Sequence, residues 1–502
     1  MARSPGRPTA EAATVILLAL GFGAWAAVAS RWLHPHLTRN ADEATYLQQG
    51  AVLASGHLTA APPGDLRAFQ PWFATVRDGR YVFKYTLVWP AVLAFGRVLG
   101  TPRVGLFLAA AAAVVGVYLL AREILGSHRR GLAATVLVMV APLVAFDATT
   151  FLPYVWFSAL WTFTAWAVLR AARSRHPGFA LAAGALAGLT FFARPYEALF
   201  VLAPFGVWLL WDGRREVGAL ARRVGWIVVG TVVPLAVFAV TNDALTGSPV
   251  RTTLTAWDPL DRPGFGPRRI LGTGPPQIDF TVRDGIVGLA KHTVHLQWWS
   301  AGGVVLAALA VGGLVVGWRR RGVVPLAAVV VTLALGLVAY WGPYSTASLW
   351  PDFARSLGPF YLMPMLVPLA ILAVEGLAAL RSRAPAFAVV AVVLLVAITG
   401  VNTGRALDLN LGVRRARDRH FEALDGVDRS RRVLVFVPSW SDYLGTGPNG
   451  ALVNTRSNPR VLYANASTPE AEQAVIAAFP DRVPYRLVRD GRTTTLTELT
   501  RR

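Results

Sequence analysis

The feature that most constrains this chain is a series of apolar segments, each close to the length of about 20 residues that crosses a bilayer as a helix. By this criterion the 502-residue sequence holds about eleven spans. They are approximately 12–32, 103–122, 131–148, 152–170, 178–193, 196–211, 224–242, 299–317, 323–341, 358–380 and 384–401. The sequence therefore predicts an α-helical polytopic membrane protein. Only 15% of the residues are charged, against about 25% in soluble domains.

The distribution of basic residues predicts how the chain crosses the membrane. It has 49 Lys and Arg against 28 Asp and Glu, and most arginines in short loops fall on one side if the spans alternate. Because cytoplasmic loops are enriched in Lys and Arg, this predicts a cytoplasmic N-terminus and an external C-terminus in the plasma (inner) membrane. The excess charge is explained by topology, so no nucleic-acid partner is expected. We expect the first span to be a retained anchor.

The polar segments predict two domains. Residues 1–401 form the transmembrane domain, which includes a large first external loop at 33–84, and residues 402–502 form a small extracytoplasmic α/β domain. In this tail we expect strands at 432–437, 460–463 and 485–489 and a helix at 468–479, which Thr468 and Pro469 begin. The stretch 82–99, interrupted by Lys84 and Pro90, is expected to be an interfacial helix.

An acidic pair, Asp42 and Glu43, follows the first membrane exit. One interpretation is structural: Asn40 caps a helix, and acids in its first turn are favoured by the helix dipole. The other is catalytic, because a carboxylate at the membrane surface can accept the proton of an acceptor hydroxyl. The two interpretations are compatible, since the cap would orient the helix that carries the base.

Three cations lie at the outer membrane edge without a topological reason. Lys84 is either a snorkelling anchor among aromatic residues or a phosphate ligand. Arg194, with Glu197 close by, is either part of an ion pair or a second phosphate ligand. Arg355 lies where the tenth span begins and has the same two interpretations. Together they would suit a diphosphate or phosphodiester, because guanidinium groups bind phosphate bidentately.

Two further features are ambiguous in the sequence. Asp147, at the outer end of the third span, either helps to bind a sugar or caps a turn. His292 and His295 are spaced i, i+3 but have no acidic third ligand nearby, which favours an interfacial belt over a metal site. Cysteine is absent, which excludes disulfides and thiolate chemistry. No metal site is therefore predicted.

Several motifs, in their order and membrane sidedness, resemble the GT-C superfamily of polyprenyl-phosphate-sugar glycosyltransferases. Within it the likeness is to the branch of protein O-mannosyltransferases and the lipid A aminoarabinose transferase. The motifs are Asp42-Glu43, Lys84-Tyr85…Trp89-Pro90, Arg194-Pro195, Asn242…Gly247-Ser248-Pro249 and Arg355…Gly358-Pro359 leading into Tyr361…Pro364. The likeness covers about the first 400 residues. The tail resembles the external domain of some bacterial members.

The resemblance implies roles for these residues. Asp42 would be the catalytic base, with Glu43 supporting it. The lipid-linked phosphate would be held by Lys84, Arg194 and Arg355, and Tyr361 would be one of the substrate-binding residues. Members often have an acidic residue near the start of the fourth span, where this chain has Leu152-Pro153-Tyr154, and Asp147 is the candidate replacement.

These observations predict an enzyme that moves a hexose or pentose from a polyprenyl-phosphate donor to an acceptor hydroxyl on the external face. The acceptor class, whether glycan, lipid or protein, stays open, and membrane lipids are the other expected partners. No cofactor is needed because the donor carries its own leaving group, although a divalent cation is compatible with the site. The alternatives are a transporter or flippase of lipid-linked saccharides and a structural protein. A transporter would place its charges in mid-span and often shows inverted repeats.

Overall fold

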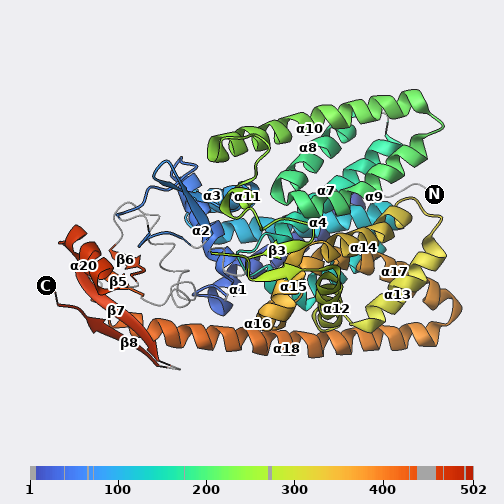
Figure 1. Ribbon diagram of the computed structural model, residues 1–502. Helices are drawn as coiled ribbons and strands as arrows, with labels where there is room; N and C mark the ends of the chain where they lie inside the picture. Colours follow the sequence, from blue (N-terminus) through green and yellow to red (C-terminus); the bar gives the residue numbers. More distant parts are fainter. Residues whose placement is uncertain are drawn as a thin grey trace.

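The computed structural model describes residues 7–500, apart from residues 39, 65–66, 72, 175, 270–273, 429, 438–459, 467 and 491–492. Apolar helices form one bundle, a set of loops and short elements covers one end, and a small sheet stands beyond that end (Figure 1). The long helix α18 runs along one edge of the bundle and leads to the sheet (Figure 1). The predicted class, a helical membrane protein with a small C-terminal sheet region, is confirmed.

The main helices follow the predicted apolar segments, except α12 (Val282–Trp299), which precedes the predicted span 299–317 and lies where no span was expected. They are α1 (Arg7–Leu33), α4 (Arg103–Leu125), α5 (His128–Met139), α6 (Pro142–Asp147), α7 (Tyr154–Arg173), α8 (Pro177–Ala193), α9 (Pro195–Gly213), α10 (Val217–Thr246), α12 (Val282–Trp299), α13 (Val304–Gly317), α14 (Val323–Val338), α17 (Leu366–Arg383) and α18 (Pro385–Asp425). Among the described residues, five helices are long and apolar enough to cross a membrane, or up to seven if each bent pair counts as one span. The total of eleven spans stays a prediction.

One break in the bundle has a clear backbone cause. Helices α12 and α13 meet at an angle of 101°. The turn between them contains Gly302 and Gly303, with φ of +75° and +55°. Backbone in this left-handed region is accessible to glycine at little cost, so the pair allows the chain to change direction. Helix α12 is thereby placed among the loops at the end of the bundle, and α13 enters the bundle.

The covering layer at that end is made of short elements. They are α2 (Ala41–Ala54), β1 (Ala74–Arg77), β2 (Arg80–Phe83), α3 (Val88–Val98), α11 (Thr253–Trp257), β3 (Gly266–Arg268), β4 (Ile278–Phe280), α15 (Trp341–Tyr344), a π-helical turn (Ser345–Leu349), α16 (Pro351–Ser356) and a 3₁₀ turn (Phe360–Met365). Strands β1 and β2 form an antiparallel hairpin in which Thr75 pairs with Val82. The interfacial helix predicted for 82–99 therefore begins too early: Val82 and Phe83 lie in a strand because their backbone pairs with β1.

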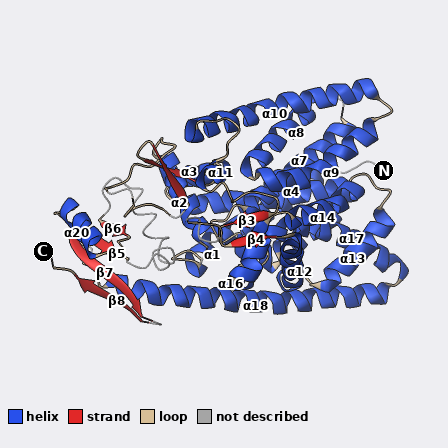
Figure 2. Ribbon diagram, viewed as in Figure 1, coloured by secondary structure: helices blue, strands red, loops and turns tan. Residues whose placement is uncertain are grey.

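The sheet beyond the covering layer has the strand order β6-β5-β7-β8 (red in Figure 2). Its elements are β5 (Val433–Phe436), β6 (Val461–Ala464), α20 (Pro469–Ala478), β7 (Val483–Asp490) and β8 (Thr493–Glu498). Strand β5 is parallel to β6 and β7, and β8 is antiparallel to β7. The predicted strands and helix are present, and the Thr468 side chain caps α20 as expected. Strand β8 was not predicted.

The sheet contacts the rest of the protein through the loop that follows α2. The Phe69 ring lies 5.6 Å from the Phe479 ring, and the Asn465 amide donates to the Ala68 carbonyl at 2.8 Å. Helix α18 continues without interruption from 385 to 425, through residue 401, where the tail was expected to begin. The division into domains stays a prediction, but the transmembrane helix and the linker to the sheet are one continuous element.

Candidate functional site

The acidic pair lies in the first turn of α2. The Asn40 side chain accepts a hydrogen bond from the Asp42 amide at 3.0 Å, so Asn40 caps the helix as the sequence indicated. Successive residues of a helix point about 100° apart. The two carboxylates therefore meet different surroundings, although they are neighbours in the chain.

Glu43 faces the protein interior and is fully buried. Its carboxylate accepts hydrogen bonds from the Thr38 amide at 2.7 Å, the Thr38 hydroxyl at 2.6 Å and the Phe151 amide at 2.8 Å. Burial raises the pKa of Glu43, and the Thr38 and Phe151 hydrogen bonds and the Arg417 charge oppose that rise. Arg417, from α18, also donates to the Thr38 carbonyl. Glu43 thus ties α2 to the segment before α7, and we call this set of contacts the Glu43 anchor.

Asp42 faces the covering layer and is half-buried. Burial raises the pKa of this carboxyl above its usual range, while the Lys84 charge, a hydrogen bond from the Tyr85 hydroxyl and the Arg194 charge oppose the rise. A second carboxylate, Asp261, adds to the rise. A carboxylate in such surroundings can act as a general base because its pKa lies closer to neutrality than that of an exposed aspartate. We give the name Asp42 pocket to this carboxylate and the side chains that act on it, namely Lys84, Tyr85, Arg194 and Asp261.

Lys84 is held in the Asp42 pocket by a buried ion pair. Its Nζ lies 2.7 Å from Oδ2 of Asp261, and both side chains are almost fully buried. The ammonium also lies 4.3 Å and 4.4 Å from the ring centroids of Trp257 and Phe73, within the range of a cation–π contact. Trp341 donates to the other oxygen of Asp261 at 2.8 Å. Asp261 was missed by the sequence analysis, because a lone aspartate in a long loop carries no signal of its own.

The backbone around Lys84 is fixed from three directions. The Thr253 hydroxyl donates to the Lys84 carbonyl at 2.8 Å. Gln49 of α2 donates to the Tyr85 carbonyl at 2.7 Å, and the Thr86 hydroxyl donates to the Ala193 carbonyl at 2.9 Å. These contacts join α2, the loop that contains α11 and the end of α8 to a single short segment. The interpretation of Lys84 as a solvent-directed anchor does not describe this geometry.

Arg194 stands in the turn between α8 and α9. Its Nε donates to Oε1 of Glu197 at 2.9 Å, so the ion pair that the sequence left open is present. Its guanidinium also lies 4.4 Å from the centroid of the Tyr154 ring and donates to the Tyr154 hydroxyl at 3.4 Å. Because its charge also acts on Asp42, Arg194 belongs to the same pocket.

Tyrosines form the rest of the pocket wall. Tyr46, one turn after Asp42 on α2, stacks on Tyr85 at 4.3 Å between ring centroids. Tyr361 packs edge-on against Tyr154 at 5.8 Å and against Tyr340 at 5.7 Å. The charges of Asp42 and Arg194 both act on Tyr361. The structure therefore brings Asp42, Lys84, Arg194 and Tyr361 together from segments that are far apart in the sequence.

Asp147 is buried at the end of α6. Neither of its carboxylate oxygens has a hydrogen-bond partner among the described residues. The turn that follows is closed by the Thr150 amide and hydroxyl, which donate to the backbone carbonyl of Asp147. The side chain is therefore not a turn cap, and the charges of Glu43 and Arg194 both act on it.

Arg355 differs from the other predicted cations. It lies on α16, is exposed, and its charge acts on His295 together with that of Arg405. No interaction described in the structure joins Arg355 to Asp42. The arginine is thus part of a basic group between α12, α16 and α18.

The described residues hold no group of three or more His, Cys, Asp or Glu side chains with the geometry of a metal site. The histidine pair does not form one: Nε2 of His292 lies 3.0 Å from the Pro343 carbonyl and 3.0 Å from the Thr346 hydroxyl. In the Asp42 pocket two carboxylates, Asp42 and Asp261, flank one ammonium group. This arrangement offers a proton acceptor beside two cations, which suits attack by a hydroxyl on a phosphate-linked carbon.

Comparison with known proteins gives relatives of one architecture. The model of the family described as dolichyl-phosphate-mannose-protein mannosyltransferase matches residues 87–241. ArnT from Cupriavidus metallidurans bound to undecaprenyl phosphate is similar in structure, with a TM-score of 0.53 at 13% identity over 99% of this chain and 98% of that chain. The apo state of the same protein gives a TM-score of 0.50 at 13% identity over 98% of both chains. No curated protein matches this chain.

A third solved structure, the apo form of an Archaeoglobus fulgidus oligosaccharyltransferase, has a TM-score of 0.49 at 13% identity, over 95% of this chain and 69% of that chain. The structural likeness to ArnT and the family match confirm the predicted resemblance to GT-C glycosyltransferases. The family match runs from the start of α3 into α10, so it includes Asp147 and Arg194 but not Asp42.

Proposed function

We propose that this GT-C glycosyltransferase, which uses a polyprenyl-phosphate-linked sugar, transfers the sugar to an acceptor hydroxyl on the external face of the membrane, with Asp42 as general base. The observation that carries the proposal is the convergence of one half-buried carboxylate, Asp42, with Lys84 and Arg194 in one pocket. These three residues come from the first loop and from the turn between α8 and α9.

The proposed reaction is a direct displacement at the anomeric carbon. Asp42 accepts the proton of the acceptor hydroxyl, and the hydroxyl oxygen forms a bond to the anomeric carbon of the donor sugar. The bond between that carbon and the phosphate oxygen breaks, and its electron pair stays on the phosphate. The products are the glycosylated acceptor and polyprenyl phosphate. Direct displacement of this kind inverts the anomeric configuration.

The cations stabilise the charge that develops on the leaving phosphate. Arg194 suits this role because a guanidinium binds phosphate oxygens bidentately. Lys84 carries its charge between Asp42 and the Asp261 carboxylate, so phosphate binding requires it to share its ammonium with a new partner. Because Lys84 and Arg194 supply the positive charge, the proposed step needs no resident metal ion.

The remaining predicted residues take supporting roles in the proposal. The unpaired oxygens of Asp147 accept hydrogen bonds from hydroxyl groups of the sugar. Tyr361 forms part of the wall against which the sugar packs. Glu43 positions α2 and therefore Asp42. Arg355 lies outside the pocket and contributes to the positive potential at the outer edge rather than to the phosphate site.

The decisive experiment compares Asp42→Asn with wild-type protein in proteoliposomes that contain radiolabelled polyprenyl-phosphate sugar. Release of polyprenyl phosphate on addition of a cell-envelope acceptor fraction is measured. We expect the variant to lose about 10²–10⁴-fold in rate, which is the typical contribution of a general base. Asp78→Asn is the matched control, because Asp78 is an exposed carboxylate on the β1–β2 turn, and this variant should keep the wild-type rate.

Thermal unfolding separates a loss of catalysis from a loss of folding, and both variants should unfold at the wild-type temperature. Wild-type turnover in Asp42→Asn would reject the base assignment. The transporter alternative predicts a different result: labelled donor would cross the bilayer of the proteoliposome without release of polyprenyl phosphate.

A further inference from the structure

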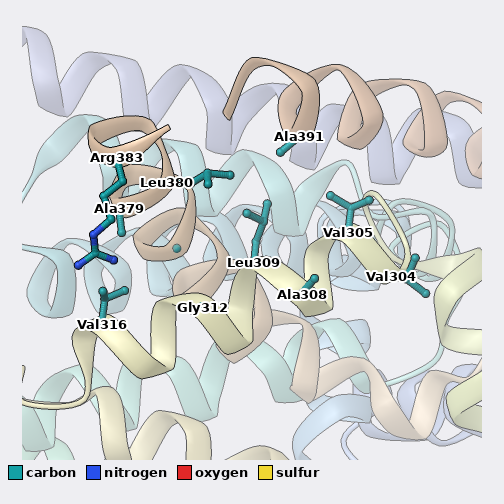
Figure 3. Close-up of a pocket in the computed structure, with 11 residues that line it drawn as sticks. Val304, Val305, Ala308, Leu309, Gly312, Val316, Ala379, Leu380, Arg383 and Ala391 are labelled. Carbon is teal, nitrogen blue, oxygen red and sulfur yellow. The ribbon is translucent and has the colours of Figure 1, made fainter. Parts of the chain in front are cut away.

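An apolar groove of about 590 Å³ runs between α13 and the neighbouring helices α17 and α18 (Figure 3). Its walls consist mainly of valine, leucine, alanine and glycine residues, from Val304 at one end to Val316 at the other. A single charged residue, Arg383, lines it, and its guanidinium lies beside Val316 (Figure 3). The groove is therefore apolar along its length and cationic at one end.

The groove is a fixed feature of the helix packing. A Cβ atom at Gly313 would overlap the Leu372 carbonyl, and one at Gly376 would overlap the Leu309 carbonyl. Helices α13 and α17 thus pack backbone to backbone, which is typical of small residues in membrane helices. At Gly312, one residue away, a Cβ would meet nothing within 4 Å. Helix α13 therefore packs tightly against α17 at Gly313, whereas the space beside Gly312 is open.

Arg383 is available to an anionic ligand. It is exposed, and the described residues provide no carboxylate partner for it. Arg320, at the same end of the bundle, differs because it pairs with Glu375 at 3.0 Å. Basic pockets between membrane helices on the cytoplasmic side are typical sites for anionic lipid headgroups.

The cationic end of the groove lies far from the Asp42 pocket. Phe360–Arg383 spans 24 residues, which corresponds to about 36 Å of helix, and Tyr361 at its beginning belongs to the pocket. A phosphate at Arg383 is therefore separated from Asp42 by about the thickness of the hydrocarbon core, roughly 30 Å. The phosphate of a donor that reacts at Asp42 does not reach Arg383. Helix α13 has 14 residues and rises about 21 Å, which is longer than the depth of one leaflet, about 15 Å.

We propose that this groove binds one acyl chain of an anionic phospholipid from the leaflet opposite the Asp42 pocket, with the lipid phosphate on Arg383. In the predicted orientation this is the cytoplasmic leaflet. The apolar walls accept the chain and Arg383 selects the headgroup charge. The site is distinct from the donor site, since the two phosphates lie at opposite ends of the bundle.

The test uses delipidated full-length protein in detergent and native mass spectrometry. Phosphatidylglycerol and phosphatidylcholine are titrated separately, and retained lipid is counted. Wild-type protein should retain phosphatidylglycerol preferentially. Arg383→Gln should weaken that retention about tenfold, since a direct hydrogen bond from its guanidinium to the lipid phosphate contributes about 1.5 kcal/mol. Gly312→Leu should abolish retention in the groove, because the new side chain extends into the open space.

Two variants serve as matched controls. Arg381→Gln removes an exposed charge of the same helix end that does not line the groove. Gly206→Leu adds the same side chain to an exposed face of α9, where a Cβ also meets nothing within 4 Å. Both controls should retain lipid as the wild type does.

Three results would overturn the proposal. The first is equal retention of both lipids by wild-type protein. The second is an equal loss in Gly312→Leu and Gly206→Leu. The third is a Gly312→Leu variant that still retains phosphatidylglycerol but no longer binds polyprenyl phosphate. That result would assign the groove to the donor.

Discussion

The Asp42 pocket and the Glu43 anchor begin from adjacent residues of one helix and differ in almost every physical respect. The Glu43 carboxylate is fully buried and accepts three hydrogen bonds from the protein. The Asp42 carboxylate is half-buried and lies among the charges of Lys84, Arg194 and Asp261. The anchor is complete without a ligand, whereas the pocket contains a carboxylate that remains accessible beside cations.

This difference shows that one helical turn can carry both a structural carboxylate and a carboxylate that is available to a substrate. A buried carboxylate with all its donors in place holds a backbone segment, because leaving those donors unpaired costs free energy. A partly exposed carboxylate beside opposite charges can exchange protons with a substrate. The comparison predicts that changes in the pocket alter catalysis, and that changes in the anchor alter stability first.

After Asp42→Asn, we expect the largest effect on transfer from removal of the Arg194 guanidinium. In the double variant Arg194→Gln/Glu197→Gln, both partners of the ion pair are neutralised, so no buried charge is left unpaired. We expect KM for the donor to rise about 10- to 100-fold, since hydrogen bonds to charged groups contribute about 1.5–3 kcal/mol. Donor titrations at saturating acceptor measure this. Arg355→Ala is the comparison variant and should change the donor KM much less; an equal rise in both would place Arg355 in the pocket.

The pH dependence of transfer should shift in opposite directions in two pocket variants. Asp42 acts as a carboxylate, so the acid limb of kcat/KM follows its pKa. Lys84 lowers the pKa of Asp42, so Lys84→Met raises that pKa and moves the limb to higher pH. Asp261 raises the pKa of Asp42, so Asp261→Asn lowers it and moves the limb to lower pH.

The pH profiles of kcat/KM for both variants measure these shifts. The position of the limb is the readout, not its height, because Lys84→Met also removes a phosphate ligand. Shifts in the same direction would show that the limb does not report on Asp42.

The smallest effect on transfer is expected in the anchor. Glu43→Gln replaces one acceptor oxygen with a donor that faces the Thr38 or Phe151 amide. We expect the free energy of unfolding to fall by about 1–3 kcal/mol, the penalty for a buried unsatisfied group. The acid limb of kcat/KM should stay where it is in the wild type. Thermal unfolding in detergent measures stability, with Glu216→Gln, at an exposed glutamate, as control. A shifted acid limb with unchanged stability would contradict the division between anchor and pocket.

Sequence analysis reached the fold class, most helix positions, the Asn40 cap and most elements of the tail. These depend on local patterns: apolar length, capping residues and alternation. It did not reach the β1–β2 hairpin, helix α12, strand β8 or the bend between α12 and α13, because strand pairing and the placement of a helix at the end of the bundle depend on distant segments.

The sequence by itself determined that the chain is a multi-pass membrane protein, and it predicted that Asp42, Glu43, Lys84 and Arg194 lie at the same membrane edge. Hydrophobic length and charge are properties of each segment, so they can be read without neighbours. Only the tertiary structure decided that Asp42 and Glu43 face different regions, that Asp261 pairs with Lys84 and that Arg355 lies elsewhere. Burial, pairing and electrostatic contact are relations between segments that are distant in the chain, and packing alone sets them.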